Sequence, residues 1–362
     1  MTSNAFELTD PAVIDDLRER LSRFRPVDRV GLTGDRGVDH ALVARLVERW
    51  KTGFDWAAQE RRIAAYPWEQ TARTRVPIRA IVSRAPEPAP VVLLLHGWPD
   101  SVLRFERVFP RLSDVTFVAP ALPGFPFAAP SAGMSAVDMA DAIAEAMAEL
   151  GFDRYVISAG DIGCDVAEAL AGRHPGAVAA LHLTDVSQLH YLVDPPADLD
   201  EEEREYAAAG HRWQAAEGGY MHEQSTRPDT LAVGLGDSPA GLAAWIVEKL
   251  IRWTDSGDEL GAVFTDDEAL TWVSAYWVTG TIGTSFGPYA ASRPMDWPRV
   301  EAPTVFTIFP KDLVNAPRRF AERFFNVVDW REHDAGGHFA AWERPDDYLW
   351  GLRRALDERR AG

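Results

Sequence analysis

The chain has 362 residues, 46% of them hydrophobic and 25% charged, a composition typical of a globular protein with one large domain and an insertion, or with two domains. The formal net charge of −18 argues against nucleic acid or an anionic membrane surface as a partner. Cys164 is the only cysteine, which excludes an internal disulfide and fits a reducing compartment.

No targeting or membrane-spanning segment is expected from the sequence. The first twenty residues are charged and lack the apolar core of a signal peptide. No stretch approaches the roughly 18 consecutive apolar residues that a membrane-spanning helix needs. We therefore expect a cytoplasmic protein without a membrane partner, and a homodimer is left open as its oligomeric state.

Residues 1–75 are expected to form a mostly helical N-terminal extension. Within it, Leu42, Val43, Leu46 and Trp50 recur at helical spacing and predict one buried helix face.

The segment 76–190 alternates predicted strands and helices. Its apolar run "VVLLL" is typical of a strand that is buried on both faces. Strands are expected at 76–83, 89–97, 114–125, 154–160 and 179–185, and helices at 135–151 and 164–174. Such alternation predicts parallel βαβ units.

The alternation stops near residue 190, and 191–300 is expected to be a helical, aromatic insertion. Strands return at 302–309 and 326–333, followed by a last helix at 345–360. The predicted fold class is therefore α/β: a core of 76–190 and 301–362 with a mostly parallel sheet, interrupted by a helical lid.

Asp161 occupies an unusual turn between a predicted strand and a helix. The stretch "VISAGDIGCDVAEAL" (156–170) has the form of the nucleophile turn of lipases and esterases, with aspartate in place of serine. Small residues on both sides allow a sharp turn. Two interpretations stand: Asp161 is a nucleophile, or it caps the helix that follows.

A second turn follows the buried strand at 89–97. In "HGWPDS", Gly97, Trp98 and Pro99 can aim a backbone N–H into a pocket, as an oxyanion hole requires, although a purely structural turn is the alternative. Ligands of such sheets bind beyond the carboxyl ends of the strands, where this turn and Asp161 both lie.

His338 lies in "DAGGHFAAWERP" after the strand at 326–333. A lone loop histidine is often incidental, but nucleophile, acid and late histidine is the chain order of α/β-hydrolases. Asp312 follows the strand at 302–309 and supplies the acid. Glu332 and Asp334 are nearer to His338 in sequence, but a carboxylate on a neighbouring strand end is better placed to orient the imidazole.

An aspartate nucleophile predicts a particular chemistry. Asp161 is ionised at neutral pH and suits attack on an sp³ carbon, which forms an alkyl ester. His338, oriented by Asp312, would then activate water to hydrolyse that ester. The backbone N–H groups of Trp98 and Ile162 would stabilise the oxyanion.

The leaving group distinguishes two enzymes. A haloalkane dehalogenase needs N–H donors for halide, commonly from a tryptophan after the nucleophile, but Ile162 has no side-chain donor. An epoxide instead needs an acid, usually tyrosine, on the opposite wall. Composition does not choose among the insertion's candidates, Tyr191, Tyr206, Tyr220, Tyr276 and Tyr289.

The chain resembles the microsomal-type epoxide hydrolases almost end to end. The resemblance rests on "VERWKTGFDWAAQERRIAAYP", "HGWPDS", "PALPGF", the long lid stretch from "GYMHEQSTRPDT" to "LIRWTD", "AYWVTGTIGTS" and "GGHFAAWERP". It implies an α/β-hydrolase core with a helical lid and an N-terminal extension, no cofactor and no metal. A small-molecule epoxide, bulky and apolar or aromatic, is the implied substrate.

The resemblance also assigns roles to residues. It implies Asp161 as nucleophile, His338 as base, Asp312 as the acid, and Tyr220 and Tyr276 as the donors to the epoxide oxygen. The sequence departs from the family at Ala159, Ile162 and Asp100, where glycine, tryptophan and glycine are common. A role in bacterial secondary metabolism is expected, with detoxification, dehalogenation or non-catalytic ligand binding as alternatives.

Overall fold

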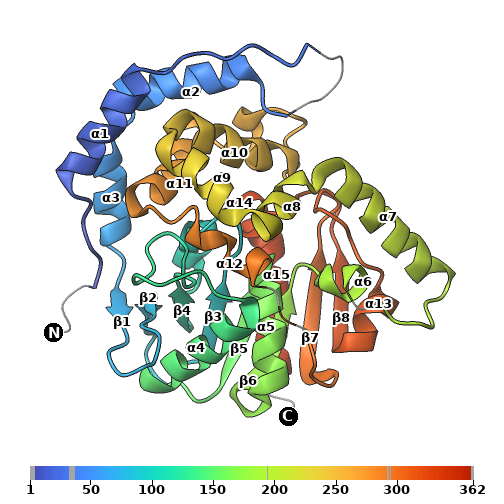
Figure 1. The fold of residues 1–362 in the computed structure, drawn as a ribbon. Coiled ribbons are helices and arrows are strands. Elements are labelled where there is room, and N and C mark those ends of the chain that lie inside the picture. Colours follow the sequence, from blue (N-terminus) through green and yellow to red (C-terminus); the bar gives the residue numbers. More distant parts are fainter. Residues whose placement is uncertain (1–4, 32–36, 194, 292, 294, 360–362) are drawn as a thin grey trace.

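The fold is built around one eight-stranded sheet (Figure 1). The computed structural model describes residues 5–31, 37–193, 195–291, 293 and 295–359. The strand order is β1-β2-β4-β3-β5-β6-β7-β8, antiparallel at the two β2 ladders and parallel elsewhere. The strands are β1 (Trp68–Gln70), β2 (Arg79–Ser83), β3 (Val91–Leu95), β4 (Thr116–Pro120), β5 (Tyr155–Ala159), β6 (Val178–Leu183), β7 (Val300–Ile308) and β8 (Phe325–Glu332).

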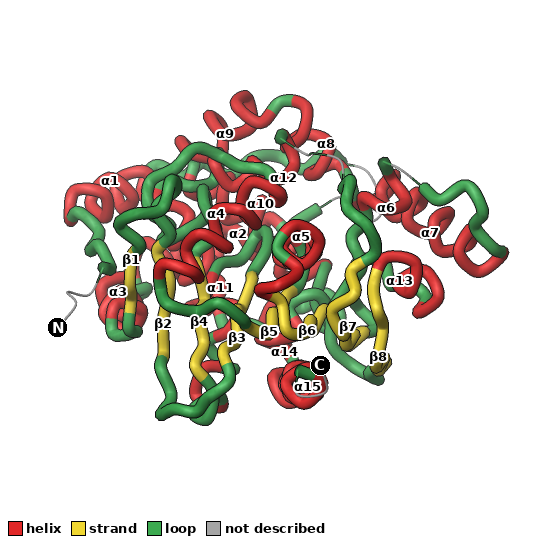
Figure 2. Tube along the Cα trace, turned by 90° about the horizontal axis from the view of Figure 1, so that it is seen from below, coloured by secondary structure: helices red, strands yellow, loops and turns green. Residues whose placement is uncertain are grey.

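The predicted mostly parallel sheet is confirmed, and its central strands are buried because helices cover both faces. Figure 2 shows α4 and α5 on one face and α15 on the other. Strands β3, β4, β5 and β6 contain no Lys, Arg, Asp or Glu, as expected for strands shielded from water on both sides. The core helices are α4 (Ala136–Glu149), α5 (Ile162–Arg173), α13 (Arg318–Phe324), α14 (Ala340–Glu343) and α15 (Pro345–Glu358).

The N-terminal segment contains three helices, each begun by an aspartate whose carboxylate accepts a backbone N–H of the first turn. They are α1 (Pro11–Ser22), α2 (His40–Thr52) and α3 (Trp56–Ala64). The buried face of α2 includes Val43, Leu46 and Trp50, as the helical spacing predicts. The extension is not wholly helical, because β1 joins the edge of the sheet by pairing with β2.

The insertion between β6 and β7 is helical and lies over the carboxyl ends of the parallel strands (Figure 1). Helices α10 and α11 also contact the N-terminal helices, so the extension packs against the insertion. The helices of the insertion are α6 (Leu189–Leu192), α7 (Glu201–Glu217), α8 (Gly219–Thr226), α9 (Pro228–Asp237), α10 (Pro239–Arg252), α11 (Asp266–Thr279) and α12 (Gly287–Ala290). Boundaries at 75/76, 190/191 and 300/301 stay predictions.

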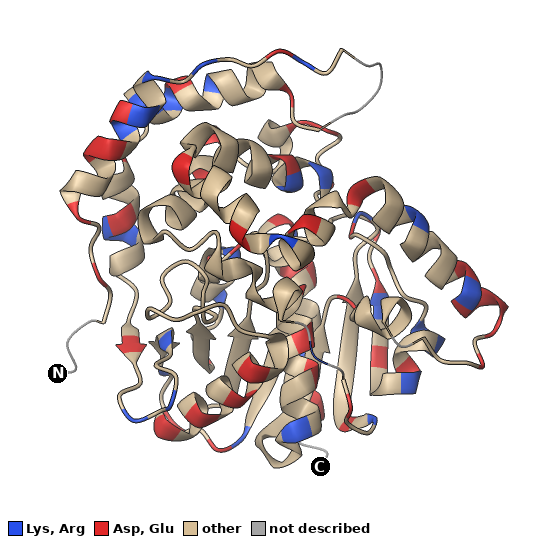
Figure 3. Cartoon of the chain, viewed as in Figure 1, with Lys and Arg blue, Asp and Glu red and all other residues tan. Residues whose placement is uncertain are grey.

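Charged side chains are concentrated on the outer helices, such as α1, α4 and α7 (Figure 3). Among the described residues, no single helix has the length and apolar composition to span a membrane. Helices α9 and α10 have the required length and composition only when taken together, and the chain bends by 113° between them.

Short 3₁₀ helices lie between the longer elements: Val102–Phe105, Phe109–Arg111, Pro175–Ala177, Leu260–Ala262 and Thr284–Phe286.

Candidate active site

Asp161 lies on the sharp turn between β5 and α5, with a φ of 57° that non-glycine residues rarely adopt. The turn is possible because Gly163 packs directly on the backbone carbonyls of Leu95 and His96, where a Cβ would not fit. Although Asp161 occupies the N-cap position of α5, its side chain makes no capping hydrogen bond. The carboxylate is therefore free to face the site, and helix capping does not explain this residue.

The carboxylate of Asp161 is held by the turn after β3. The backbone N–H of Trp98 donates to Asp161 Oδ1 at 2.7 Å. Gly97 leaves room for this approach, since a Cβ there would overlap the Asp161 carboxylate. Trp98 thus has the position expected of an oxyanion donor. Ile162 begins α5 directly after Asp161, and it lines the same cavity.

His338 lies between two carboxylates. Its Nδ1 is 2.7 Å from Asp312 Oδ1, and its Nε2 is 3.2 Å from Asp161 Oδ2, although this second contact lacks regular hydrogen-bond geometry. Of the acids near His338, the one bonded to it is thus Asp312. The carboxylate of Glu332 instead accepts from the indole of Trp330. Three strand ends therefore bring Asp161, Asp312 and His338 together.

A buried ion pair supports the two loops that carry Trp98 and His338. Arg104 Nη1 lies 2.6 Å from Asp100 Oδ2, and Asp100 Oδ1 accepts the N–H of Gly97 at 2.8 Å. The other guanidinium nitrogen of Arg104 donates to the carbonyl oxygen of His338. The side chains of Asp100 and Arg104 are at most 1% exposed. The acid in place of the family's frequent glycine is therefore neutralised within the fold.

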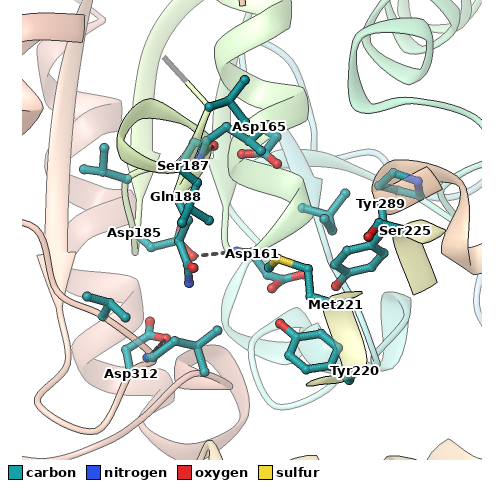
Figure 4. Close-up of a pocket in the computed structure, with 18 residues that line it drawn as sticks. Asp161, Asp165, Asp185, Ser187, Gln188, Tyr220, Met221, Ser225, Tyr289 and Asp312 are labelled. Atoms are coloured by element: carbon teal, nitrogen blue, oxygen red, sulfur yellow. Dashed lines mark hydrogen bonds between the residues drawn. The ribbon is translucent and has the colours of Figure 1, made fainter. Parts of the chain in front are cut away.

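The two predicted tyrosine donors lie in different surroundings. Tyr220 on α8 stacks on Trp98, with ring centroids 5.3 Å apart and planes at 6°, and it lines the cavity. Tyr276 on α11 is also buried, but its hydroxyl donates to the backbone carbonyl of Asp100 at 3.0 Å, and it is not among the cavity-lining residues. Tyr289 on α12 lines the cavity, and Figure 4 shows its hydroxyl and that of Tyr220 pointing toward Asp161.

The remaining candidate tyrosines serve packing. Tyr191 donates to Gln188 Oε1 at 3.0 Å, and its ring packs edge-on against Tyr206. Neither of them is among the residues that line the cavity.

The cavity beside Asp161 has a volume of about 260 Å³ and a mostly apolar wall with four carboxyl groups (Figure 4). This volume is near the lower end of small-molecule sites, which are about 300–1,000 Å³. None of the described residues that line it is Lys or Arg. Its wall is formed by Asp161, Ile162, Asp165, Asp185, Val186, Ser187, Gln188, Leu189, Leu192, Val193, Tyr220, Met221, Ser225, Pro288, Tyr289, Asp312, Leu313 and Val314.

Burial and neighbouring charges shift the pKa values of the titratable groups around the cavity. Burial alone would lower the pKa of His338, but the charge of Asp312 and the contact with Asp161 raise it to about 10. Burial raises the pKa values of Tyr220 and Tyr289 well above their ordinary value. Both phenols therefore keep their protons until a strong base, such as an alkoxide, forms beside them.

The sequence analysis did not single out Asp165, Asp185 or Arg104. It kept Tyr289 among the open candidates, and the family resemblance selected Tyr220 and Tyr276. Two signals were available. Asp185 ends the predicted strand at 179–185, where the rule that pointed to Asp312 applies equally. Asp165 is one helical turn after Asp161 and so shares its face of α5. One oxygen or nitrogen each from Asp185, Asp312 and His338 lies within 4.8 Å of the other two, a set that could also approach a metal ion.

An eight-stranded, mostly parallel sheet with Asp161 on a sharp turn after β5, Asp312 after β7 and His338 after β8 is the arrangement of an α/β-hydrolase. Comparison with known proteins agrees: a model of the alpha/beta hydrolase fold matches residues 90–216, and a model of the epoxide hydrolase N terminus matches residues 5–105.

The chain belongs to the epoxide hydrolase family and is an enzyme of that class. A protein of Stigmatella aurantiaca assigned as an epoxide hydrolase is 34% identical over 98% of this chain and 85% of that protein. Epoxide hydrolase 1 of Sus scrofa is 28% identical over 96% of this chain and 87% of its own. The structure of Aspergillus niger epoxide hydrolase superposes with a TM-score of 0.87 at 28% identity, covering 99% of this chain and 97% of that one. A non-catalytic binding protein is therefore set aside.

Proposed function

We propose that this epoxide hydrolase converts an epoxide and water into a vicinal diol through a covalent ester of Asp161. The observation that carries the proposal is the pair of contacts made by the Asp161 carboxylate: Oδ1 accepts from the N–H of Trp98, and Oδ2 lies 3.2 Å from His338 Nε2. Asp161 also lines a cavity whose wall is mostly apolar. An ionised carboxylate with no capping bond is a nucleophile that needs no base.

In the first step an Asp161 oxygen bonds to an epoxide carbon, and the ring C–O bond breaks. The ring oxygen leaves as an alkoxide that stays attached to the product through the second carbon. A tyrosine on the opposite wall protonates it, which prevents ring closure. The phenolate then recovers its proton from His338 or solvent.

We assign this proton donation to Tyr220 and Tyr289 and give Tyr276 a positioning role. The hydroxyls of Tyr220 and Tyr289 point toward Asp161 in the cavity, whereas the Tyr276 hydroxyl is engaged with the Asp100 carbonyl. A bonded donor outside the cavity cannot reach the epoxide oxygen without breaking that bond. Tyr276 instead ties α11 to the turn that carries Trp98.

In the second step water hydrolyses the ester. His338 takes a proton from water, and the resulting hydroxide attacks the carbonyl carbon of Asp161. The backbone N–H groups of Trp98 and Ile162 stabilise the oxyanion. The ester C–O bond then breaks, and the diol oxygen receives the proton from His338. The Asp161 carboxyl group gives its own proton to the neutral His338, which restores the carboxylate.

The cavity favours a neutral epoxide with an apolar or aromatic body. Leu189, Leu192, Val193 and Met221 offer apolar contact, while the four carboxyl groups, without a lining Lys or Arg, repel anions. Epoxides that carry a carboxylate should therefore be poor substrates. Cytoplasmic location, a homodimer and a role in secondary metabolism stay predictions from the sequence.

Diol formation tests the proposal against dehalogenation. Purified enzyme is offered neutral aryl and alkyl epoxides, and in parallel the chloroalkanes of matching carbon skeleton. The proposal predicts vicinal diols from the epoxides and no chloride from the chloroalkanes, since Ile162 provides no side-chain halide donor. Chloride release without diol formation would establish the dehalogenase instead.

A further inference from the structure

Asp185 is a third carboxylate in direct contact with the catalytic groups. It follows β6, the strand between those that carry Asp161 and Asp312. Its Oδ2 accepts the backbone N–H of Asp161 at 3.0 Å, the bond dashed in Figure 4. This bond supports the nucleophile in its rare positive-φ conformation. One oxygen of Asp185 therefore has a structural task at the turn.

The other oxygen of Asp185 belongs to a group of buried polar atoms that lack a regular hydrogen bond. Within the described part of the chain, this group includes Asp185 Oδ1, Asp312 Oδ2 and His338 Nε2, the last of which lies 3.2 Å from Asp161 Oδ2. The side chains of His338 and Asp312 are 1% and 3% exposed. A buried polar atom without a hydrogen bond is unfavourable, so several of them in one place indicate a polar ligand.

The three side chains lie close enough together to share one water molecule. Each of Asp185, Asp312 and His338 has an oxygen or a ring nitrogen within 4.8 Å of one on the other two. A buried water makes about three hydrogen bonds, and two atoms that share a water lie about 4.5–5.5 Å apart. Because Asp161, Asp185 and Asp312 line the same cavity, that water would lie beside the Asp161 carboxylate.

We propose that Asp185 holds the water that hydrolyses the Asp161 ester, while it also fixes the nucleophile turn. The inference rests on the proposed function. The water donates one proton to Asp185 Oδ1 as a hydrogen bond and gives the other to His338 Nε2, and its oxygen bonds to the carbonyl carbon of Asp161. Asp185 Oδ1 does not take part in epoxide opening, so loss of this oxygen alone should slow only the second half-reaction.

The environment of Asp185 supports this role. Burial, and then the charge of Asp312, raise the pKa of Asp185 to about 7. In its ionised form, which is populated above that pKa, the Asp185 side chain can only accept hydrogen bonds, as the proposed contact with water requires. Asp165, the fourth acid of the cavity, has no bond to the nucleophile turn and is not part of the cluster with His338.

Asp185→Asn separates the two tasks of the residue. The amide oxygen can still accept the N–H of Asp161, but an amide nitrogen in place of Oδ1 cannot accept a proton from water. Rapid-quench mass spectrometry on a single turnover measures formation and decay of the ester separately. We expect formation within about 3-fold of the wild-type rate and decay at least about 10-fold slower. Asp346→Asn, an exposed acid outside the site, is the control and should match the wild type.

Unchanged ester decay in Asp185→Asn would overturn the inference, and so would equal slowing of both steps, which indicates a purely structural role. If the Asn variant does not fold, Asp185→Ala is tested with added formate, which should speed ester decay; no rescue would count against the inference. If neither wild type nor His338→Gln forms an ester, the proposed function itself fails.

Discussion

His338 Nδ1 and Asp312 Oδ1 lie 2.7 Å apart, although the two residues are 26 positions apart in the chain. The hydrogen bond fixes the imidazole so that Nε2 faces Asp161 at 3.2 Å. A histidine held in this way can act as a base only on something beside Asp161, which in the proposed mechanism is the hydrolytic water.

The first prediction concerns the base. His338→Gln cannot accept a proton from water, whereas epoxide opening by Asp161 is retained. Mass spectrometry after addition of epoxide should therefore show the chain plus the mass of one substrate, with diol formation lowered at least about 100-fold. Consumption of substrate by an unmodified chain would contradict this account.

The second prediction concerns the acid pair. The double substitution of Tyr220 and Tyr289 by Phe should lower kcat/KM for epoxides at least about 100-fold, because the alkoxide then lacks a proton donor. Tyr276→Phe loses only the bond to the Asp100 carbonyl and should lose much less. Steady-state rates of these variants on one neutral aryl epoxide distinguish the two assignments of the donor pair. If Tyr276→Phe loses much more activity than Tyr289→Phe, the donor pair is Tyr220 and Tyr276, as the family resemblance implies.

The third prediction concerns the charge of Asp161. The pKa of His338 is raised to about 10 by Asp312 and by Asp161, so a neutral residue at 161 should lower it. NMR titration of ¹³C-labelled histidine in Asp161→Asn, with His338→Gln to identify the signal, should show deprotonation at lower pH than in the wild type. The Asp161 ester of the proposed mechanism is also uncharged, so its formation should lower the pKa of His338 in the same way. The imidazole can then lose its proton and act as a base. An unchanged titration would mean that Asp161 does not stabilise the imidazolium.

The fourth prediction concerns the buried pair of Asp100 and Arg104. Arg104→Met leaves the Asp100 carboxylate buried without its cation, so the free energy of unfolding should fall by about 3–5 kcal/mol. Arg353→Met, which breaks an exposed pair with Asp114, should cost about 1 kcal/mol or less. Urea denaturation of both variants measures the difference. Equal losses would show that burial of the pair carries no special weight.

Much of the fold follows from local pattern. The strand expected at 302–309 is β7 (Val300–Ile308), and the helix expected at 135–151 is α4 (Ala136–Glu149). Both patterns persist over many residues and arise from burial, so they are visible without tertiary information. The three-residue β1 is different: only its pairing with β2 makes it a strand, and the sequence analysis placed it in a helical extension.

The same distinction applies to the site. Asp161, Asp312 and His338 could be predicted because the ends of parallel strands meet at one edge of a sheet, whatever the lid does. The tyrosines lie on lid helices, whose rotation is set by packing rather than by spacing. Tyr276 and Tyr289 therefore could not be ranked from sequence. Asp185 also ends a predicted strand at the same edge of the sheet. The sequence analysis did not select it, because Asp312 already supplied the acid that the expected chain order requires.

One measurement tests the covalent mechanism most directly: a single turnover in ¹⁸O-labelled water with enzyme in excess over epoxide. Because water attacks the carbonyl carbon of Asp161, the peptide that contains Asp161 should gain one ¹⁸O atom, and the diol should contain none. A labelled diol with an unlabelled Asp161 peptide would mean that water opens the epoxide directly, and the ester mechanism would be wrong.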